Sequence, residues 1–441
     1  FEEGDYGMAY RRFRLVTNTY PLNLKTTAAV LMAGKALYRQ GEFERAEEVL
    51  GRFIQTYPTS SYVDEAEETL RFAREQMTIE GERRDVVNLG ILLPLGADDA
   101  ALTQALFNGI RLAVEDFNAQ NEQGVTIRMV FEDSGGDPAR TRQAVMALAD
   151  QTSVILGPLY SEEAEAAAEA AEEEEVVMIA PLATDDAVSE GKRYVFQANP
   201  TLATRGRLVA DFAMRNLRLR RFGVVAERSS SAISERMAES FQEEAMRQGA
   251  EVVFFKLLPS ARSWVQLREA LEGDEEGEDL LSEVEALYLP VSGADAVENI
   301  QAALRELERT NADVRVLGNA EWDDLPSKLL ASRFQTTYSN DFYVDEQNPD
   351  VQAFAERYET LTGTNATALD ANPRRLAFTG YDLAQYVLAQ ISDGEGEQLA
   401  GALRAAPPYQ GLGIRLDFSG SNVNQAMYFF RYRAGRLEAL R

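Results

Sequence analysis

From Val86 onward, short apolar runs alternate with longer amphipathic segments, and this alternation restricts the fold more than any other feature of the 441-residue chain. The first run, Val86–Leu93, is largely apolar and is ended by Pro94, which is typical of a strand buried on both faces of a parallel sheet. Helix-like and strand-like segments then follow one another in order. This alternation predicts a parallel sheet covered by helices on both faces.

The alternation occurs twice, so two α/β halves of similar size are expected. In the first half we expect strands at 86–93, 125–132, 154–157, 176–180 and 194–197, with helices at 101–120, 137–150 and 161–174. In the second half we expect strands at 221–226, 252–256, 286–290 and 314–318, with helices at 205–216, 234–248 and 263–271. The pattern then predicts a crossover at 336–342, helices at 350–361 and 377–392, and closing strands at 413–418 and 426–432.

An internal repeat with an offset of 37 residues occupies the N-terminal part of the chain. Its paired positions are aromatic, small and apolar in turn: Tyr6 with Phe43, Ala9 with Ala46, and Phe13 with Leu50. A small residue at a repeated helical position lets a neighbouring helix approach closely. The pattern resembles tetratricopeptide repeats and predicts an all-α helical-repeat module over residues 1–80. Protein binding and a purely structural spacer are both open as its role.

The residue inventory limits the chemistry. The chain contains no cysteine and no histidine, which excludes thiol chemistry, a Ser-His-Asp triad and the usual zinc or copper sites. We also find no Walker loop and no nucleophile-elbow motif. The sequence therefore predicts a protein that is not an enzyme and that has neither a cofactor nor a metal site.

The net charge of −28 disfavours nucleic acid as a partner. Basic residues are nearly all arginine, and an acidic, lysine-poor surface of this kind favours a salt-adapted (halophilic) source. A merely acidic protein is the alternative. No run of apolar residues is long enough for a direct membrane span. An export signal is also absent from this chain.

Several motifs, taken in order, carry a family resemblance. They are Leu89–Leu95, Phe107–Asn118, Gly157–Ser161, Ile179–Thr184 and Phe196–Pro200. Over residues 86–440 the chain resembles the type I periplasmic solute-binding proteins, and within them the branched-chain amino acid receptors. A tetratricopeptide-like segment joined to such a domain is similar in architecture to the outer-membrane lipoprotein activators of penicillin-binding proteins.

The resemblance implies a fold of two lobes, each with a doubly wound parallel sheet, joined by three crossings and preceded by the all-α module. The implied lobe 1 is residues 86–203 plus 341–424. The implied lobe 2 is residues 204–340 plus 425–441. Ligands of open α/β sheets lie beyond the carboxyl ends of the strands, so the expected site is the groove between the lobes.

On the lobe 1 side, the resemblance implies ligand contacts from Ser161 and Thr184, which match the positions that grip an α-carboxylate in the amino acid receptors. Tyr160 and Ala183, next to them, complete this side of the expected site. Ser161 is also well suited to cap the following helix. Thr184 also suits an ordinary turn, so both residues have a structural alternative.

On the lobe 2 side, the resemblance places Ser292, Glu321 and Trp322 at the groove. Glu321 is close to where the receptors place the acid that pairs with the ligand ammonium. A solvated loop is the structural alternative for Glu321, and covering the hinge is the alternative for Trp322.

The function implied is capture of a small solute, an amino acid or amide-like compound, for an ABC-type importer or a sensor. Its partners would be the solute and a membrane permease. The alternative is an envelope scaffold or regulator that binds proteins such as peptidoglycan synthases through its helical repeats, with a vestigial cleft. Either role implies an exported protein of the periplasm or cell envelope, and lipid anchoring stays open.

Overall fold

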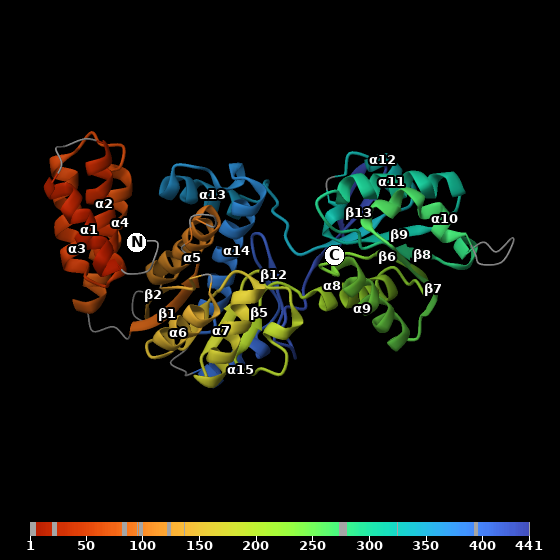
Figure 1. Cartoon of the computed structure of the whole chain (residues 1–441), viewed down its shortest axis with the longest axis horizontal. Helices are drawn as coiled ribbons and strands as arrows, with labels where there is room; N and C mark the ends of the chain where they lie inside the picture. Colours follow the sequence, from red (N-terminus) through yellow and green to blue (C-terminus); the bar gives the residue numbers. More distant parts are fainter. Residues whose placement is uncertain are drawn as a thin grey trace.

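The computed structural model describes residues 6–19, 24–81, 86–94, 96, 100–120, 125–135, 137–272, 280–323, 325–391 and 396–440. Three bodies follow one another along the long axis of the molecule: a helical module, lobe 1 and lobe 2 (Figure 1). None of the described helices combines the length and the apolar character needed to cross a bilayer.

The helical module consists of four helices, α1 (Tyr6–Thr19), α2 (Leu24–Arg39), α3 (Phe43–Thr56) and α4 (Val63–Gly81). Helices α1 and α3 begin at Tyr6 and Phe43, the two aromatic residues that open the repeat units. The small repeat residues Ala9 and Ala46 are both buried, which allows the helices to pack closely. The turn before α3 contains Gly41 at φ 73°, a conformation that favours glycine. The predicted helical-repeat module is confirmed.

Lobe 1 is built on a five-stranded parallel sheet with the order β2-β1-β3-β4-β5. In β1, Ile91 and Leu93 face one core, whereas Leu92, between them, faces the other, as the two-residue period of a strand requires. Helices therefore cover both faces. Its strands are β1 (Val86–Leu93), β2 (Thr126–Asp133), β3 (Val154–Leu156), β4 (Val177–Ala180) and β5 (Val195–Gln197).

The two faces of this sheet carry different helices. One face is covered by α6 (Pro138–Ala149) and α7 (Ser161–Glu173). The other is covered by α5 (Ala100–Gln120), α13 (Pro349–Thr362), α14 (Ala371–Leu388) and α15 (Gly396–Ala405). Three of these helices come from the C-terminal third of the chain, so lobe 1 is completed by segments distant in sequence.

Lobe 2 is built on a seven-stranded sheet with the order β14-β13-β10-β9-β8-β6-β7. The five strands β6 to β10 are mutually parallel. Strand β13 is antiparallel to β10, and β14 is antiparallel to β13. The strands are β6 (Arg221–Glu227), β7 (Glu251–Leu258), β8 (Ala286–Tyr288), β9 (Arg315–Gly318), β10 (Thr337–Asn340), β13 (Tyr428–Arg433) and β14 (Arg436–Leu440).

The helices of lobe 2 also divide between the two faces of its sheet. One face is covered by α8 (Leu202–Arg215) and α9 (Ile233–Arg247). The other is covered by η3 (Ala261–Gln266), α10 (Leu267–Leu271), α11 (Ala296–Thr310) and α12 (Lys328–Arg333). Short 3-10 segments complete the chain: η2 (Asp186–Val188), η4 (Leu280–Glu283), η5 (Ala320–Trp322) and η6 (Ala366–Ala368).

Three expectations need correction. The second sheet is mixed, because β13 runs antiparallel to β10 and forms a hairpin with β14, whose turn residues Ala434 and Gly435 have φ 50° and 75°. The segment expected as a crossover begins with a strand, β10, and the crossing starts only at Asp341. The expected strand at 413–418 is reduced to β12 (Arg415–Leu416), which pairs with β11 (Tyr409–Gln410) in a separate small sheet.

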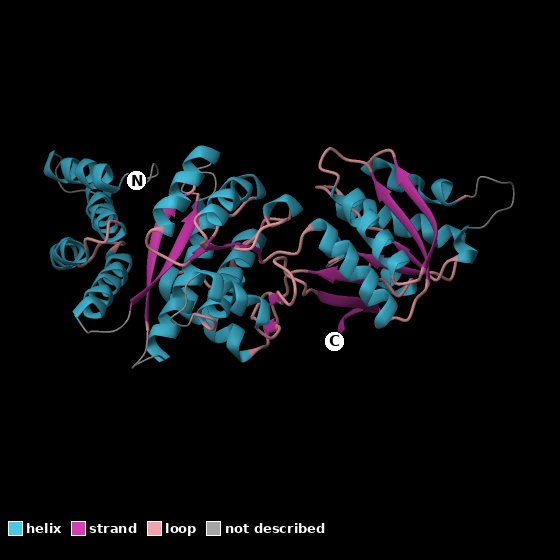
Figure 2. Cartoon of the chain, turned by 90° about the horizontal axis from the view of Figure 1, so that it is seen from below, coloured by secondary structure: helices cyan, strands magenta, loops and turns pink. Residues whose placement is uncertain are grey.

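The chain passes between the lobes after β5, after β10 and after β12, and these crossings form a narrow waist between two bodies lying side by side (Figure 2). The first and third crossings pair with each other. The Gln197 amide donates to the Asn422 carbonyl at 2.8 Å, and the Asn424 amide donates to the Gln197 carbonyl at 3.0 Å. The waist is therefore held by backbone hydrogen bonds between segments distant in sequence.

Candidate functional site

Ser161 and Thr184, which follow neighbouring strands β3 and β4, lie in contact. The Ser161 Oγ accepts hydrogen bonds from the backbone N–H groups of Thr184 at 3.2 Å and Asp185 at 3.4 Å. The residue at the N-cap of α7 is Tyr160, and its side chain makes no capping hydrogen bond. The Ser161 hydroxyl thus holds the neighbouring strand-end loop instead of capping its own helix.

The two other residues expected on this side differ in exposure. The Tyr160 side chain is 37% exposed, whereas Ala183 is 1% exposed. The Ala183 carbonyl accepts a hydrogen bond from Gln197 Nε2 at 3.1 Å. Ala183 therefore helps to hold the loop through its backbone carbonyl, and its buried side chain presents no surface to a ligand.

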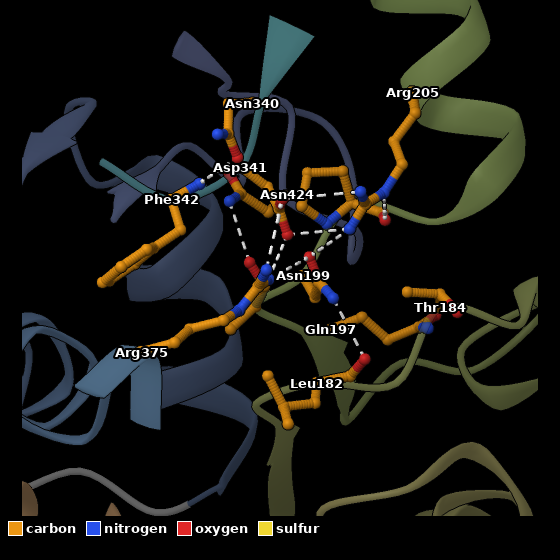
Figure 3. Close-up of polar contacts among 12 residues, drawn as sticks. Leu182, Thr184, Gln197, Asn199, Arg205, Asn340, Asp341, Phe342, Arg375 and Asn424 are labelled. Carbon is orange, nitrogen blue, oxygen red and sulfur yellow. Dashed lines mark hydrogen bonds and ion pairs between the residues drawn. The ribbon is translucent and has the colours of Figure 1, made fainter. Parts of the chain in front are cut away.

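Buried amides at the end of β5 fix the loop that carries Thr184. Gln197 Nε2 donates to the Asp185 carbonyl at 2.9 Å, and Asn199 Nδ2 donates to the Leu182 carbonyl at 3.0 Å. Figure 3 shows both amides pointing toward this loop from the first crossing. Because a buried amide must find partners, these contacts hold the loop in one conformation.

Asn199 also belongs to a charged cluster at the waist, centred on Asp341 (Figure 3). Asp341 lies on the second crossing and is buried. Arg205 Nη2, from α8 of lobe 2, lies 2.8 Å from Asp341 Oδ2 and also 2.8 Å from Asn199 Oδ1. Arg375, from α14 of lobe 1, donates to the same Asp341 oxygen. The aspartate is thus held by one arginine from each lobe.

The electrostatics of this cluster favour the ionised carboxylate. Burial alone would raise the pKa of Asp341, but the charges of Arg205 and Arg375 outweigh burial and hold the pKa well below its ordinary value. Asp341 therefore stays charged at neutral pH, and the cluster ties the hinge to the Thr184 loop through Asn199.

In lobe 2, Ser292 does not face an empty space but contacts a buried carboxyl group. Both its backbone N–H, at 2.9 Å, and its hydroxyl, at 2.5 Å, donate to Glu227 Oε1 at the end of β6. Trp264 Nε1 donates to the other oxygen at 2.8 Å. Burial raises the pKa of Glu227, and the hydrogen bonds from Ser292 and Trp264 oppose that shift. The Ser292 hydroxyl is therefore already hydrogen-bonded to a glutamate of the protein itself.

In the loop after β9, the neighbouring residues Glu321 and Trp322 differ in exposure. Trp322 is 0% exposed, and its Nε1 donates to the Leu289 carbonyl at 3.0 Å. A Cβ on Gly318 would lie 2.4 Å from the indole, so the ring packs directly against the end of β9. Trp322 is a core residue with no surface for a ligand.

Glu321 is exposed. Partial loss of hydration raises its pKa, the charge of Arg205 lowers it, and the charge of Asp341 raises it further, with the upward shift prevailing. The interaction with both hinge residues places Glu321 near the waist. Among the described residues, no group of three or more acidic side chains is arranged to hold a metal ion.

A direct ion pair also joins the two lobes beside this region. Arg236 Nη2, on α9 of lobe 2, lies 2.5 Å from Asp186 Oδ2 in the lobe 1 loop that follows Thr184. Two cavities lie away from these residues. One, of about 920 Å³, lies between the helical module and lobe 1, and the other, of about 440 Å³, lies beside α8 and β11.

The residues that sequence reasoning missed are Asn199, Arg205, Asp341, Arg375 and Glu227. Asn199 lies inside the family motif Phe196–Pro200, and Asp341 ends a polar segment. The sequence carries no other indication of this cluster. Their partners come from segments distant in sequence, so the clusters become visible only in the folded chain.

Comparisons with known proteins agree with this architecture. A family model described as a periplasmic binding protein matches residues 86–436, and one described as an outer membrane lipoprotein matches residues 1–76. A leucine-specific-binding protein of Salmonella typhimurium is 25% identical over 182 residues, which are 40% of this chain and 48% of that protein. The chain thus matches about half the length of this curated relative.

Several solved structures share the fold. A protein from Rhodospirillum rubrum described as a branched-chain amino acid ABC transporter aligns with a TM-score of 0.62 and 22% identity, covering 80% of this chain and 100% of that one. A substrate-binding protein from Desulfitobacterium hafniense, in complex with Leu, aligns with a TM-score of 0.54 and 18% identity, covering 81% and 100%. Since the periplasmic binding protein model spans both lobes, the chain belongs to the periplasmic binding protein family.

Proposed function

We propose that this chain binds a small solute, an amino acid or amide-like compound, between its two lobes and presents it to an ABC-type permease or a sensor. The proposal is for a non-enzymatic protein of the periplasm or cell envelope. The observation that carries it is the contact between Ser161 and Thr184, which brings two strand-end loops of lobe 1 together next to the hinge.

The donors and acceptors of this contact suit an oxygen of the solute. Because the Ser161 oxygen accepts N–H groups from the Thr184 loop, the hydroxyl proton of Ser161 is left to donate. The Thr184 hydroxyl has no hydrogen-bond partner among the described residues. The N-terminus of α7, which has no side-chain cap, adds backbone N–H groups, but Glu162 and Glu163 in its first turn offset the partial positive charge of the helix. An uncharged amide carbonyl of the solute therefore fits this set better than a carboxylate.

Glu321 supplies the complementary group from lobe 2. Its exposed carboxylate lies near the waist and suits an ammonium or amide N–H of the solute. A solute that contacts Ser161 and Thr184 in lobe 1 and Glu321 in lobe 2 would stabilise an arrangement in which the lobes approach each other. A permease or sensor would then recognise this shift in population.

A thermal-shift screen over amino acids and small amides tests the proposal. A compound that binds only the folded chain raises its melting temperature. Thr184→Val should abolish the increase, whereas the matched variant Thr360→Val, at an exposed position of α13, should preserve it. A panel without any increase in the wild-type chain would reject solute capture.

The second candidate is an envelope scaffold with a vestigial cleft. One observation supports it: Ser292 and Trp322, two of the three residues expected from lobe 2, make hydrogen bonds within lobe 2. The match of the N-terminal module to an outer membrane lipoprotein family also agrees with an envelope role. A flat solute screen together with direct binding of a purified peptidoglycan synthase would favour the scaffold.

A further inference from the structure

Strand β14 forms one edge of the lobe 2 sheet. It pairs with β13 on one side, and no described strand pairs with its other side. Figure 2 shows this edge of the sheet beside the label C. An edge strand exposes backbone N–H and C=O groups with which a further strand can pair. Strand β14 is therefore open to pairing with a strand of another chain.

The register of the β13–β14 hairpin determines which backbone groups of β14 are open. Arg433 and Arg436, which flank the two-residue turn, form a pair. The pair that closes such a turn is hydrogen-bonded, and hydrogen-bonded and non-hydrogen-bonded pairs then alternate. Arg436 and Glu438 therefore direct their N–H and C=O groups toward β13, whereas Leu437 and Ala439 direct theirs outward.

The open edge carries exposed apolar side chains. Tyr432 of β13 belongs to the core beneath α12 and lies opposite Leu437, so Leu437 and Ala439 lie on the α12 face of the sheet. Leu437 is 39% exposed, and Leu329 on α12 is 76% exposed. A Cβ on Gly435 would lie 3.0 Å from Leu329 Cδ2, so Leu329 reaches the start of β14. Two exposed leucines thus form an apolar patch along this edge.

The charges of β14 are complementary to those of a second copy. Arg436 and Glu438 lie on either side of Leu437. A two-fold axis through Leu437 makes two β14 strands antiparallel and places Arg436 of each copy opposite Glu438 of the other. The outward backbone groups of Leu437 then meet those of its copy. Opposite charges at opposed positions stabilise an antiparallel pair, whereas an axis through Glu438 would oppose two glutamates.

Both charged side chains are available for this contact. Arg436 is exposed and makes no ion pair with the described residues. The Glu438 carboxylate lies 3.5 Å from Arg431 and 3.8 Å from Arg433 of its own chain. These distances are longer than an ordinary hydrogen bond to a charged group. Glu438 can therefore accept a direct hydrogen bond from an arginine of a second copy.

The distribution of charge along the chain also favours contact through lobe 2. Residues 86–203 and 341–424, which form lobe 1, include 32 acidic and 11 basic residues, whereas residues 204–340 and 425–441 of lobe 2 include 25 and 21. Repulsion between two copies is therefore weakest where lobe 2 meets lobe 2. Strand β14 runs back toward the waist (Figure 1), so antiparallel pairing directs the two copies of lobe 1 away from each other.

We propose that two copies of this chain pair through β14 in an antiparallel arrangement with its two-fold axis at Leu437. The two seven-stranded sheets become continuous, and the two Leu437 side chains contact each other. This register places Ala439 opposite Gly435 of the other copy, where Leu329 covers it. A contact of one short strand and one helix residue is a small interface, so the dimer forms reversibly and only at high protein concentration. The interlobe groove takes no part in this contact.

Sedimentation velocity of the full chain from micromolar to submillimolar concentrations tests the pairing. The wild-type chain should convert from monomer to dimer as its concentration rises. Arg436→Glu and Glu438→Arg each place like charges opposite each other, so each variant alone should remain monomeric. An equimolar mixture of these two variants restores opposite charges at both positions and should dimerise. The matched variant Arg262→Glu, at an exposed arginine elsewhere in lobe 2, should behave as wild type.

Cross-linking tests the register. The chain has no cysteine, so Leu437→Cys introduces a single thiol directly opposite its copy. The Cα atoms of a hydrogen-bonded antiparallel pair lie ~5.5 Å apart, which is within the range of a disulfide. Mild oxidation should therefore link Leu437→Cys chains in pairs. Val265→Cys, at a position of lobe 2 that is 57% exposed, should remain unlinked.

Three results would overturn the proposal. They are a wild-type chain that stays monomeric at submillimolar concentration, an Arg436→Glu variant that dimerises as wild type does, and a mixture of the two charge variants that stays monomeric although both melt as wild type does. Should Glu438→Arg fold poorly, Ala439→Pro replaces it. Proline removes the outward N–H group of residue 439 and spares the hydrogen bonds to β13, so dimerisation should be lost. A dimer that survives this change would also overturn the proposal.

Discussion

Arg205 Nη2 lies 2.8 Å from Asp341 Oδ2, and this contact joins a helix of lobe 2 to the second crossing between the lobes. Arg375 of lobe 1 binds the same oxygen, so each lobe contributes one arginine to a single buried carboxylate. Because Asn199 connects Arg205 to the loop that carries Thr184, the hinge and the proposed solute site share one hydrogen-bond network.

Asp341→Asn should destabilise the chain by about 3–5 kcal/mol, because two half-buried arginines lose a buried counter-charge. Urea denaturation at neutral pH measures this difference. The folded-state pKa of Asp341 is depressed, so its contribution is fully present above the unfolded pKa of about 3.8 and is lost as pH falls below that value. The difference between wild type and variant should therefore be constant from about pH 5 to 8 and should shrink below about pH 4. An unchanged difference at low pH would show that the ion pairs are not its source.

Ser161→Ala should mainly reduce solute affinity, whereas Ser292→Ala should mainly reduce folding stability. Ser161→Ala removes a hydroxyl that faces the proposed solute, so affinity should fall about tenfold with a stability loss of about 1 kcal/mol. Ser292→Ala removes a hydrogen bond to buried Glu227, so it should cost about 1.5–3 kcal/mol of stability and change affinity little. Calorimetric titration and urea denaturation of both variants check this. A larger loss of affinity in Ser292→Ala would place Ser292 in the solute site.

Phe72→Ala should loosen the helical module from lobe 1. The substitution removes the ring that packs against the Arg111 guanidinium and leaves a cavity in its place. The free energy of unfolding should fall by about 3 kcal/mol. Hydrogen exchange should increase in α4 and around Arg111 on α5, and small-angle scattering should report a larger radius of gyration. Exchange in the lobe 2 sheet is the internal control and should not change. A scattering profile identical to wild type would contradict this account of the interface.

The contact between α5 and α14 depends on two glycines. A Cβ on Gly109 would lie 2.1 Å from the Ala377 carbonyl oxygen, and a Cβ on Gly380 would lie 2.2 Å from the Leu106 carbonyl oxygen. Gly109→Ala should therefore destabilise lobe 1 by about 1–3 kcal/mol through overpacking. Gly401→Ala, in helix α15 with nothing within 4 Å of the added Cβ, should instead stabilise the chain by about 0.5–1 kcal/mol. Thermal denaturation of both variants distinguishes them.

Much of the fold could be predicted because its signals are local. The apolar run of β1 and the paired positions Ala9 and Ala46 each report burial through their own sequence neighbourhood. Strand β10 could not be recognised in this way. Its residues include Thr337, Ser339 and Asn340, which are polar yet buried, and only the strands on either side of them make that segment a strand.

The candidate site shows the same division. Ser161 and Thr184 lie at strand ends within short motifs, so a family resemblance was enough to single them out. The partner of Ser292 is Glu227, on a different strand, and no local pattern in the sequence predicts that contact. Trp322 resembled a rim aromatic because it follows a strand end, but its position against Gly318 turns the ring into the core.

The central claim is that a solute brings the two lobes together at the strand ends that carry Ser161 and Thr184. The chain has no cysteine, so Glu165→Cys on α7 and Glu239→Cys on α9, both at exposed positions, give one spin label in each lobe. Electron–electron double resonance then measures the distance between the labels with and without a solute identified in the thermal screen. The account predicts a shorter distance with solute, and no shortening when the labels are combined with Thr184→Val. A distance distribution that the solute leaves unchanged in the labelled chain would contradict it.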